Sequence, residues 1–90
     1  MCSVQYEEDK NRAAAYDGER VVGECDYERP GKTWLINRAY VEDAYVSGGA
    51  ADQLMECIAR HARMKGAIVV PLCFYATSWF RRHRAYGDVL

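Results

Sequence analysis

The sequence predicts one α/β (α+β) domain whose elements follow in the order βββαβα and form a mixed sheet. Three observations support this prediction: an Asp-Gly step between two apolar runs, an apolar pattern of helical period in the second half, and a β-branched run directly after it. A chain of 90 residues has room for one hydrophobic core, so residues 1–90 are expected to form a single domain.

The fold is expected to open with two antiparallel strands at residues 12–17 and 20–27. Asp17-Gly18 lies between them, and glycine accepts the positive φ of a tight hairpin turn. A second turn, Arg29-Pro30-Gly31-Lys32, then leads into the next strand.

Residues 33–41, TWLINRAYV, are rich in strand-forming types and predict a central strand. Both faces of this strand carry apolar groups, which is typical of a strand covered on both sides. If the side chains simply alternate, one face of this strand carries Leu35, Ala39 and Val41. The other face then carries Trp34, Ile36 and Tyr40.

Residues 49–65 change to helical spacing, with Ala51, Leu54, Met55, Ile58 and Ala62 on one side and Lys65-Gly66 as a stop. Residues 67–72 then form a short apolar strand. Because a whole helix intervenes, this strand must run parallel to residues 33–41. Residues 76–84 predict a second helix.

Composition restricts the possible partners and the compartment. The net charge is -1, so no overall positive field favours nucleic acid or anionic lipid, and no apolar window is long enough for a signal peptide or a membrane span. Cysteines at positions 2, 25, 57 and 73 lack disulfide or CxxC spacing, which indicates reduced thiols in the cytoplasm. Cys57 and His61 alone do not make a zinc site, so no metal is expected.

Ser47-Gly48-Gly49 directly precedes the first predicted helix. Small residues there let backbone N–H groups approach an anion at the positive end of the helix, so this loop is a candidate phosphate site. A tight turn with a helix cap is the alternative interpretation. The spacing matches neither a Walker loop nor a dinucleotide fingerprint.

Pro71 cannot donate to a sheet, so strand pairing should stop there and leave a slot in which an extended ligand bonds to free backbone groups of residues 69–72. Ligands bind beyond the carboxyl ends of parallel strands, and both Cys73 and the Ser47–Ala50 loop are expected at that edge. Cys73 is then either a functional thiol or a small buried hydrophobe.

These features together resemble the small GCN5-related N-acetyltransferase-like (GNAT) family of single-domain proteins. The resemblance runs from the Asp17-Gly18 hairpin onward. Its motifs are a strand ending in Tyr27, a Val before the loop (Val41), a Gly-x-Ala helix start (Gly49, Ala50, Ala51), a V-x-P-x-C-x-Y strand exit (Val69, Pro71, Cys73, Tyr75) and a closing tail (Arg82, His83, Tyr86, Asp88, Leu90).

The resemblance implies a minimal GNAT-like fold that binds acetyl-CoA, with Cys73 as the catalytic residue. The expected cofactor contacts are Val41, the loop residues Val46, Ser47, Gly48, Gly49, Ala50 and Ala51, the strand residues Val70, Pro71 and Leu72, and Tyr75, Arg82 and His83. The chain departs from the family pattern where the loop lacks an initial Arg-Gly, where Arg38-Ala39 replaces His-Thr, and where Arg84 replaces a Pro.

The function expected from this resemblance is acetyl transfer from acetyl-CoA to an amine, such as a protein lysine or a polyamine, because the acceptor side should be open. Cys73 could carry the acetyl group covalently or line the pocket during direct attack, and no general base can be named. The alternatives are a CoA-binding module without turnover and a thiol redox sensor that uses Cys73. A monomer or a weak homodimer is expected.

Overall fold

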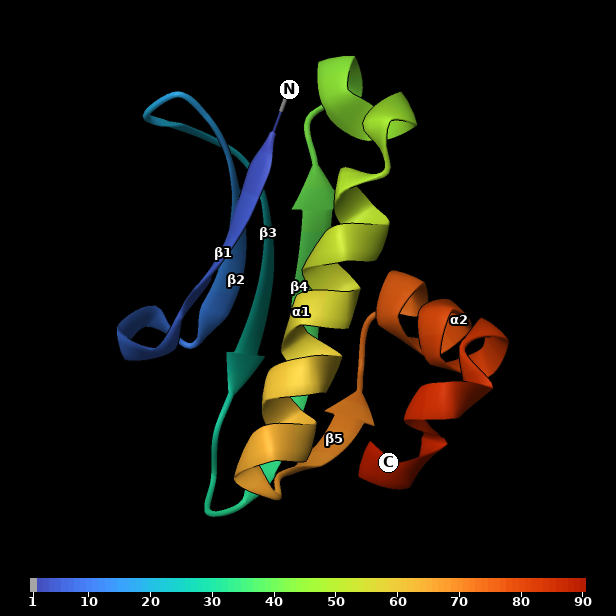
Figure 1. Ribbon diagram of the computed structural model, residues 1–90. Coiled ribbons are helices and arrows are strands. Elements are labelled where there is room, and N and C mark those ends of the chain that lie inside the picture. The colour runs from blue at the N-terminus through green and yellow to red at the C-terminus, as the bar shows by residue number, and fades with distance from the viewer. Residues whose placement is uncertain (1) are drawn as a thin grey trace.

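The computed structural model describes residues 2–90 as one five-stranded sheet with two helices on one side (Figure 1). The strands lie in chain order, and each pairs antiparallel with the next except the last two, which run parallel. Their bounds are β1 Ser3–Glu7, β2 Arg12–Asp17, β3 Arg20–Glu28, β4 Thr33–Val41 and β5 Ile68–Pro71. The predicted mixed α/β sheet is confirmed.

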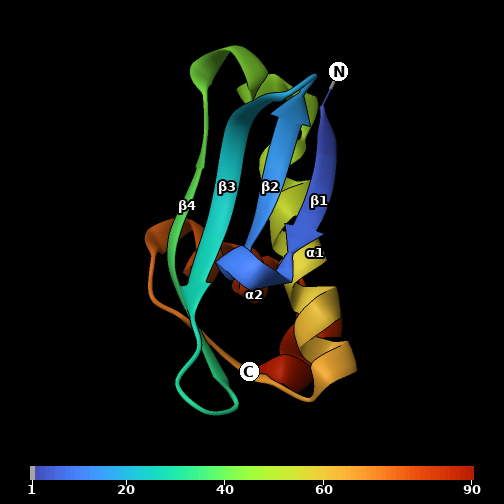
Figure 2. The same ribbon diagram turned by 90° about the vertical axis from the view of Figure 1, so that its left-hand side faces the viewer.

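The longer helix, α1 (Ala50–Lys65), lies along the sheet, and α2 (Phe74–Arg82) lies beside it near β5 (Figure 1). The side of α1 that faces the sheet is fully buried, with Leu54, Met55 and Ile58 at most 1% exposed. Gly66 ends α1 at φ 68°, where its N–H bonds to the last turn, as expected of a C-terminal glycine. When the molecule is turned by 90° about the vertical axis, the sheet lies in front of α1 and α2 (Figure 2). Neither of these helices covers the face of the sheet that is turned to the viewer.

The first strand, β1, was not predicted. Its sequence SVQYE offers only two apolar side chains, and a charged stretch follows immediately. Pairing with β2 makes it a strand, because Val4 lies opposite Ala15 and Tyr6 opposite Ala13. Both apolar side chains of β1 pack against the core, so tertiary contacts supply what the short pattern lacks.

A bulge in β4 overturns the simple alternation expected for this strand. Asp26 of β3 pairs with Arg38 and Tyr27 pairs with Ile36, which leaves Asn37 as an extra residue. Trp34 and Ile36 face the core before the bulge, whereas Tyr40 after it does not join them. The extra residue shifts the parity, so that odd-numbered residues face α1 in the second half of β4.

The two parallel strands separate halfway along β4. Their register runs from Thr33 opposite Ile68 to Ile36 opposite Pro71, and the N–H of Leu72 donates to the Ile36 carbonyl at 2.9 Å. The prediction that pairing stops at Pro71 is confirmed: Pro71 is the last residue of β5 to pair with β4, and the Cys73 N–H turns back to the same Ile36 carbonyl at 3.2 Å. The second half of β4 therefore has no β5 neighbour.

Short 3₁₀ segments connect β1 to β2 at Glu8–Lys10 and β4 to α1 at Asp43–Gly48, and a third, Arg84–Val89, follows α2. The core between the sheet and the helices is filled by side chains from every main element, with Trp34 stacked on Tyr27 at a centroid distance of 4.1 Å. α2 begins two residues before the predicted start and gives way to the last 3₁₀ segment. In residues 2–90, no helix has the length and apolar character needed to cross a membrane.

Candidate functional site

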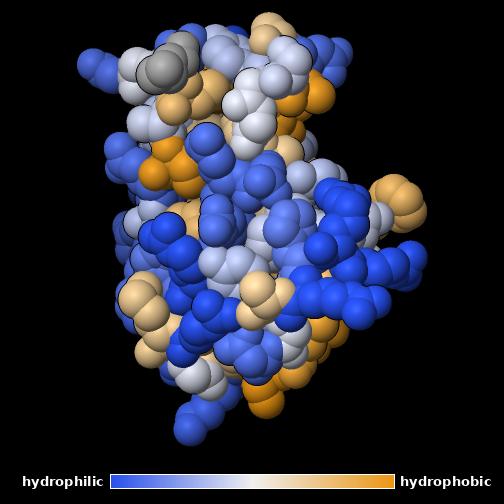
Figure 3. Space-filling model, turned by 45° about the vertical axis from the view of Figure 1, so that its right-hand side comes forward, coloured by the Kyte–Doolittle hydropathy of each residue, from blue (hydrophilic) through white to orange (hydrophobic). Residues whose placement is uncertain are grey.

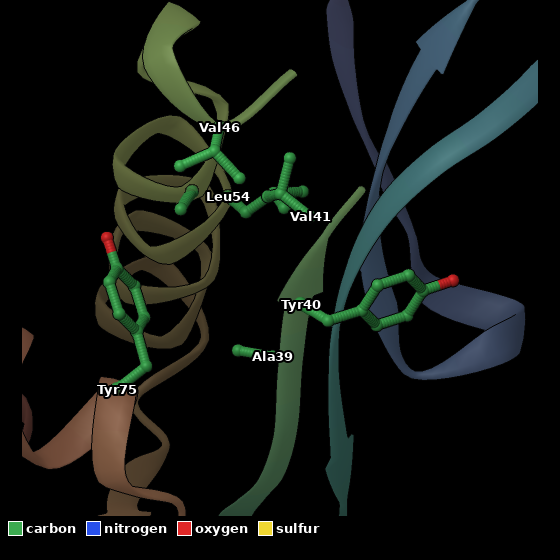
Figure 4. Close-up of a pocket in the computed structure, with 7 residues that line it drawn as sticks. Ala39, Tyr40, Val41, Val46, Leu54 and Tyr75 are labelled. Carbon is green, nitrogen blue, oxygen red and sulfur yellow. The ribbon is translucent and has the colours of Figure 1, made fainter. Parts of the chain in front are cut away.

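A cavity of about 240 Å³ opens where β4 has lost its parallel neighbour. Its walls come from the second half of β4, the loop before α1, the start of α1 and the start of α2. The lining residues are Ala39, Tyr40, Val41, Val46, Ala51, Leu54 and Tyr75. Val41, Val46 and Leu54 gather at one end, Tyr75 and Ala39 lie opposite each other at the other end, and the Tyr40 ring points away (Figure 4). The cavity is thus walled mainly by small or apolar groups.

The backbone of β4 presents free peptide groups to this cavity. The N–H of Glu42 donates to the Val22 carbonyl of β3 at 2.8 Å, so even-numbered residues after the bulge bond to β3. Because a strand alternates its bonding direction, the peptide groups of Ala39 and Val41 point to the other side, from which β5 has diverged. Two such groups can form hydrogen bonds with an extended ligand, as a missing strand would.

The expectation that β5 offers the free groups is wrong for part of that segment. Within residues 69–72, the N–H of Leu72 bonds to the Ile36 carbonyl, so this group is already occupied by β4. Val70 and Pro71 are half-buried, and Leu72 is 59% exposed. None of these three residues lines the cavity.

The start of α1 borders the cavity with unbonded backbone donors. Gly49, at φ 80°, directly precedes the helix, and its carbonyl accepts the first helical hydrogen bond, from the N–H of Gln53. The N–H groups of the first turn therefore have no partner within the helix. No side chain caps them, Ser47 included. A side chain added at Gly48 or Gly49 would meet nothing within 4 Å, so the space around both glycines is open to an anion.

Contacts to the β2–β3 hairpin hold this loop in place. The Tyr45 hydroxyl donates to the Asp17 carboxylate, and Arg20 forms an ion pair with Glu42 at 2.7 Å. The loop divides the predicted phosphate residues between two cavities. Val46 and Ala51 line the first, whereas Ser47, Gly48 and Ala50 line a second of about 500 Å³ on the other side of the α1 start.

Cys73 lies at the point where β4 and β5 separate, directly before α2. Its N–H donates to the Ile36 carbonyl at 3.2 Å, and its own carbonyl accepts the Thr77 N–H and hydroxyl, each at 3.0 Å. The residue is half-buried at the edge of the core. It neighbours the cavity through Tyr75, two residues on, but its side chain is not part of the cavity wall.

Tyr75 is the ionisable side chain of α2 that faces the cavity. Burial raises the pKa of its phenol, the charge of Asp52 raises the pKa further, and Arg82 opposes both. The phenol is therefore protonated at neutral pH and can donate a hydrogen bond or a proton.

The residues of the predicted tail are used mainly to dock the C-terminal segment on α1. The Tyr86 hydroxyl donates to Glu56 at 3.2 Å, and Arg63 pairs with Asp88 at 2.7 Å while lying 4.4 Å from the Tyr86 ring. His83 stacks on Trp79 at a centroid distance of 3.9 Å and stays partly exposed. Arg82 is exposed. With the right-hand side of Figure 1 brought forward, the molecule shows a face on which strongly hydrophilic side chains gather (Figure 3).

Cys57 and His61 occupy the other side of α1. The His61 Nδ1 donates to the Cys57 carbonyl at 2.8 Å, and the ring stacks on Tyr6 at 3.9 Å. This imidazole thus supports the packing of β1. Across residues 2–90, no group of three His, Cys, Asp or Glu side chains is placed to hold a metal ion.

Sequence reasoning missed three residues of the cavity wall: Ala39, Tyr40 and Leu54. The helical spacing predicts Leu54 as a core residue, and its side chain is indeed buried. Ala39 and Tyr40 were assigned to faces by alternation, which the bulge at Asn37 reverses. A register shift of this kind leaves no clear trace in nine residues of sequence.

Comparisons with known proteins bear on the family and on the fold. A family model described as GCN5-related N-acetyl-transferase matches residues 4–89. The solution structure of a GCN5-like protein from Staphylococcus aureus, a proposed N-acetyltransferase, superposes with a TM-score of 0.77 at 20% identity, covering 97% of this chain and 85% of the other. No curated protein matches the sequence. The structural likeness shows the fold, and the family model covers almost the whole chain.

Proposed function

Since this chain belongs to the GCN5-related N-acetyltransferase family, we propose that it binds acetyl-CoA in the cavity between β4, α1 and α2 and transfers the acetyl group to an amine. The supporting observation is that free β4 peptide groups and the unbonded first turn of α1 border the same apolar cavity. An amide-containing arm and a pyrophosphate need these two kinds of donor, and the cavity supplies both.

The residues present fit such a ligand. Peptide groups of Ala39 and Val41 would pair with its amides, and Val46 and Leu54 would contact its apolar parts. The N–H groups that follow Gly49 would hold its phosphates, helped by the partial positive charge of the helix N-terminus. None of the seven lining residues is an acid or a base other than the two tyrosines, so no charged side chain opposes a polyanion there.

Bound acetyl-CoA supplies an activated acetyl thioester. The chain would hold the thioester carbonyl near free β4 N–H groups, which favour the developing negative charge. The protonated Tyr75 phenol lies on the cavity wall and would donate a proton to the departing thiolate. Cys73, next to this wall, either accepts the acetyl group covalently or shapes the space in which an amine attacks directly.

A second candidate function is a CoA-binding module without efficient turnover. It is favoured by one specific observation: no His, Asp, Glu or Lys is part of the cavity wall, so no general base is at hand for the amine. This candidate predicts binding of CoA together with the absence of any acetylated amine.

For the acceptor we propose a flexible amine such as a lysine side chain or a polyamine, since one face of the sheet carries no helix from residues 2–90 (Figure 2). We further propose a cytoplasmic location, which fits the four free cysteines at positions 2, 25, 57 and 73.

Calorimetric titration with acetyl-CoA tests the proposal directly. Ala39→Leu adds a branched side chain to the cavity wall and should abolish saturable binding, whereas Ala85→Leu, at an exposed position of the last 3₁₀ segment, should leave binding unchanged. Incubation with a panel of amines followed by mass analysis separates the two candidates: acetylated amine supports the transferase, and binding without transfer supports the module. No saturation by the unaltered protein at millimolar acetyl-CoA would refute both.

A further inference from the structure

Asp52 links the two helices that form the cavity walls. It lies in the first turn of α1, directly after the lining residue Ala51. Its Oδ1 accepts a hydrogen bond from the indole Nε1 of Trp79 on α2, at 2.5 Å. The carboxylate is thus turned sideways toward α2, away from the helix axis where an anion would bind.

The Trp79 indole, which donates this hydrogen bond, is buried and packed against neighbouring rings. Trp79 is 1% exposed, and its ring meets Phe80 edge-on. His83 stacks on the indole at 3.9 Å and its Nδ1 donates to the Trp79 carbonyl at 2.8 Å. The His83 Nε2 lies 3.4 Å from the same Asp52 oxygen. A buried indole N–H needs an acceptor, and Asp52 provides it.

Tyr75 lies one helical turn before Trp79, so both side chains project from the same side of α2. The rotation of α2 that brings Trp79 to Asp52 therefore also sets how far Tyr75 reaches into the cavity. The Asp52 charge acts on the Tyr75 phenol as well, since it raises the pKa of that group.

We infer that Asp52 is a positioning residue for acetyl-CoA binding: by accepting the Trp79 N–H it holds α2 against the first turn of α1 and fixes Tyr75 as the cavity wall. This inference rests on the proposed function and adds a residue to it. The contact also turns the carboxylate toward α2, because its Oδ1 accepts the hydrogen bond from Trp79.

The sign of one substitution separates this role from a simple charge effect. If Asp52 acted on the ligand only through its charge, Asp52→Ala would remove a repulsion and tighten the binding of a polyanion. If Asp52 positions α2, Asp52→Ala should weaken binding, by about five- to tenfold. Asp52→Asn keeps an oxygen that can accept the indole N–H, so it should bind acetyl-CoA at least as tightly as the unaltered protein.

The control is a separate contact of α1, made with the C-terminal 3₁₀ segment. Asp88→Ala removes the ion pair with Arg63, far from the lining residues, and should lower the melting temperature without changing acetyl-CoA affinity. Trp79→Phe removes the donor while keeping an aromatic ring in the core, and it should weaken binding as Asp52→Ala does.

Titration of these variants with acetyl-CoA is combined with ¹H–¹⁵N spectra of the ligand-free protein. The indole resonance that is missing in Trp79→Phe should shift and lose its exchange protection in Asp52→Ala, and stay unchanged in Asp88→Ala. Weaker binding in Asp52→Ala with recovery in Asp52→Asn supports the inference.

Equal or tighter binding in Asp52→Ala, or an indole resonance indifferent to Asp52, overturns the inference while the proposed function stands. An unaltered protein that fails to bind acetyl-CoA overturns the proposed function and this inference together, whatever the indole spectrum shows.

Discussion

The carboxyl groups of Glu24 and Asp26 lie side by side on β3, two residues apart on the sheet face opposite α1. The Oδ1 atom of Asp26 is buried, and among residues 2–90 it has no hydrogen-bond partner as long as both groups are ionised. A proton between the two carboxyl groups would satisfy it. Burial, together with the hydrogen bond to Glu24, raises the pKa of Asp26 to about 6.

This pair predicts that Asp26→Asn stabilises the protein at neutral pH. In the unfolded chain Asp26 ionises near 3.8, so its raised native pKa favours folding below that pH, and the benefit is lost as the pH rises to about 6. An amide donates to Glu24 at every pH. The melting temperature of Asp26→Asn should therefore exceed that of the unaltered protein above pH 6, and the gain should shrink toward pH 4.

Asp88→Asn is the matched control for this pH series. Arg63 lowers the pKa of Asp88, so its ionised form stabilises the native state above its ordinary pKa. Loss of that ion pair should lower the melting temperature at neutral pH, which is the opposite sign. A destabilised Asp26→Asn at neutral pH would show that the two carboxyl groups do not share a proton.

Substitutions of Gly49 should separate backbone strain from ligand binding. Gly49 and Gly66 flank α1 with φ of 80° and 68°, so alanine at either position costs about 1–2 kcal/mol of stability. Thermal melts should show similar losses for the two alanine variants. Acetyl-CoA affinity should fall in Gly49→Ala alone, and Gly49→Glu, which adds a carboxylate at the proposed phosphate site, should abolish binding. If all three variants bind acetyl-CoA with the same affinity, the phosphates do not bind at the start of α1.

If Cys73 accepts the acetyl group, Cys73→Ala should lower the rate of acetyl transfer by roughly a hundredfold or more while leaving acetyl-CoA affinity unchanged. The residue lies at the strand separation beside Tyr75, yet it is not part of the cavity wall. Cys57→Ala is the matched control, because Cys57 is also half-buried but lies on the opposite side of α1. Turnover rates and intact masses are measured for both. Full turnover in Cys73→Ala would assign this sulfur to packing.

Tyr75→Phe removes the phenol that lines the cavity and keeps the ring. If the hydroxyl protonates the departing thiolate, kcat should fall by roughly a hundredfold and the Kd for acetyl-CoA should change little. Tyr86→Phe is the matched control. It also removes a tyrosine hydroxyl, the one that donates to Glu56 on α1, but Tyr86 does not line the cavity, so the kinetics of this variant should stay normal. Steady-state rates at saturating acetyl-CoA distinguish the two. A rise in Kd with constant kcat would reduce Tyr75 to a binding contact.

Much of this molecule could be derived from local patterns. The Asp17-Gly18 turn and the glycine stop of α1 at Gly66 each depend on the conformational limits of one or two residues. Such limits act wherever the residue stands, so they can be recognised before any tertiary contact is known. The same holds for the family, whose motifs are spread along the chain.

Other features were decided by contacts between distant segments. β1 is a strand because Val4 and Tyr6 find Ala15 and Ala13 opposite them, and the bulge at Asn37 exists only in the register between β3 and β4. That one-residue shift turns Ala39 and Val41 toward α1 and so places them on the wall of the cavity. The side chain of His83, expected at the ligand, instead stacks on Trp79, because a buried indole offers it more contact than solvent does. Local preference selects the elements, whereas register and burial are cooperative properties of the packed chain, and they determine which side chains meet at the site.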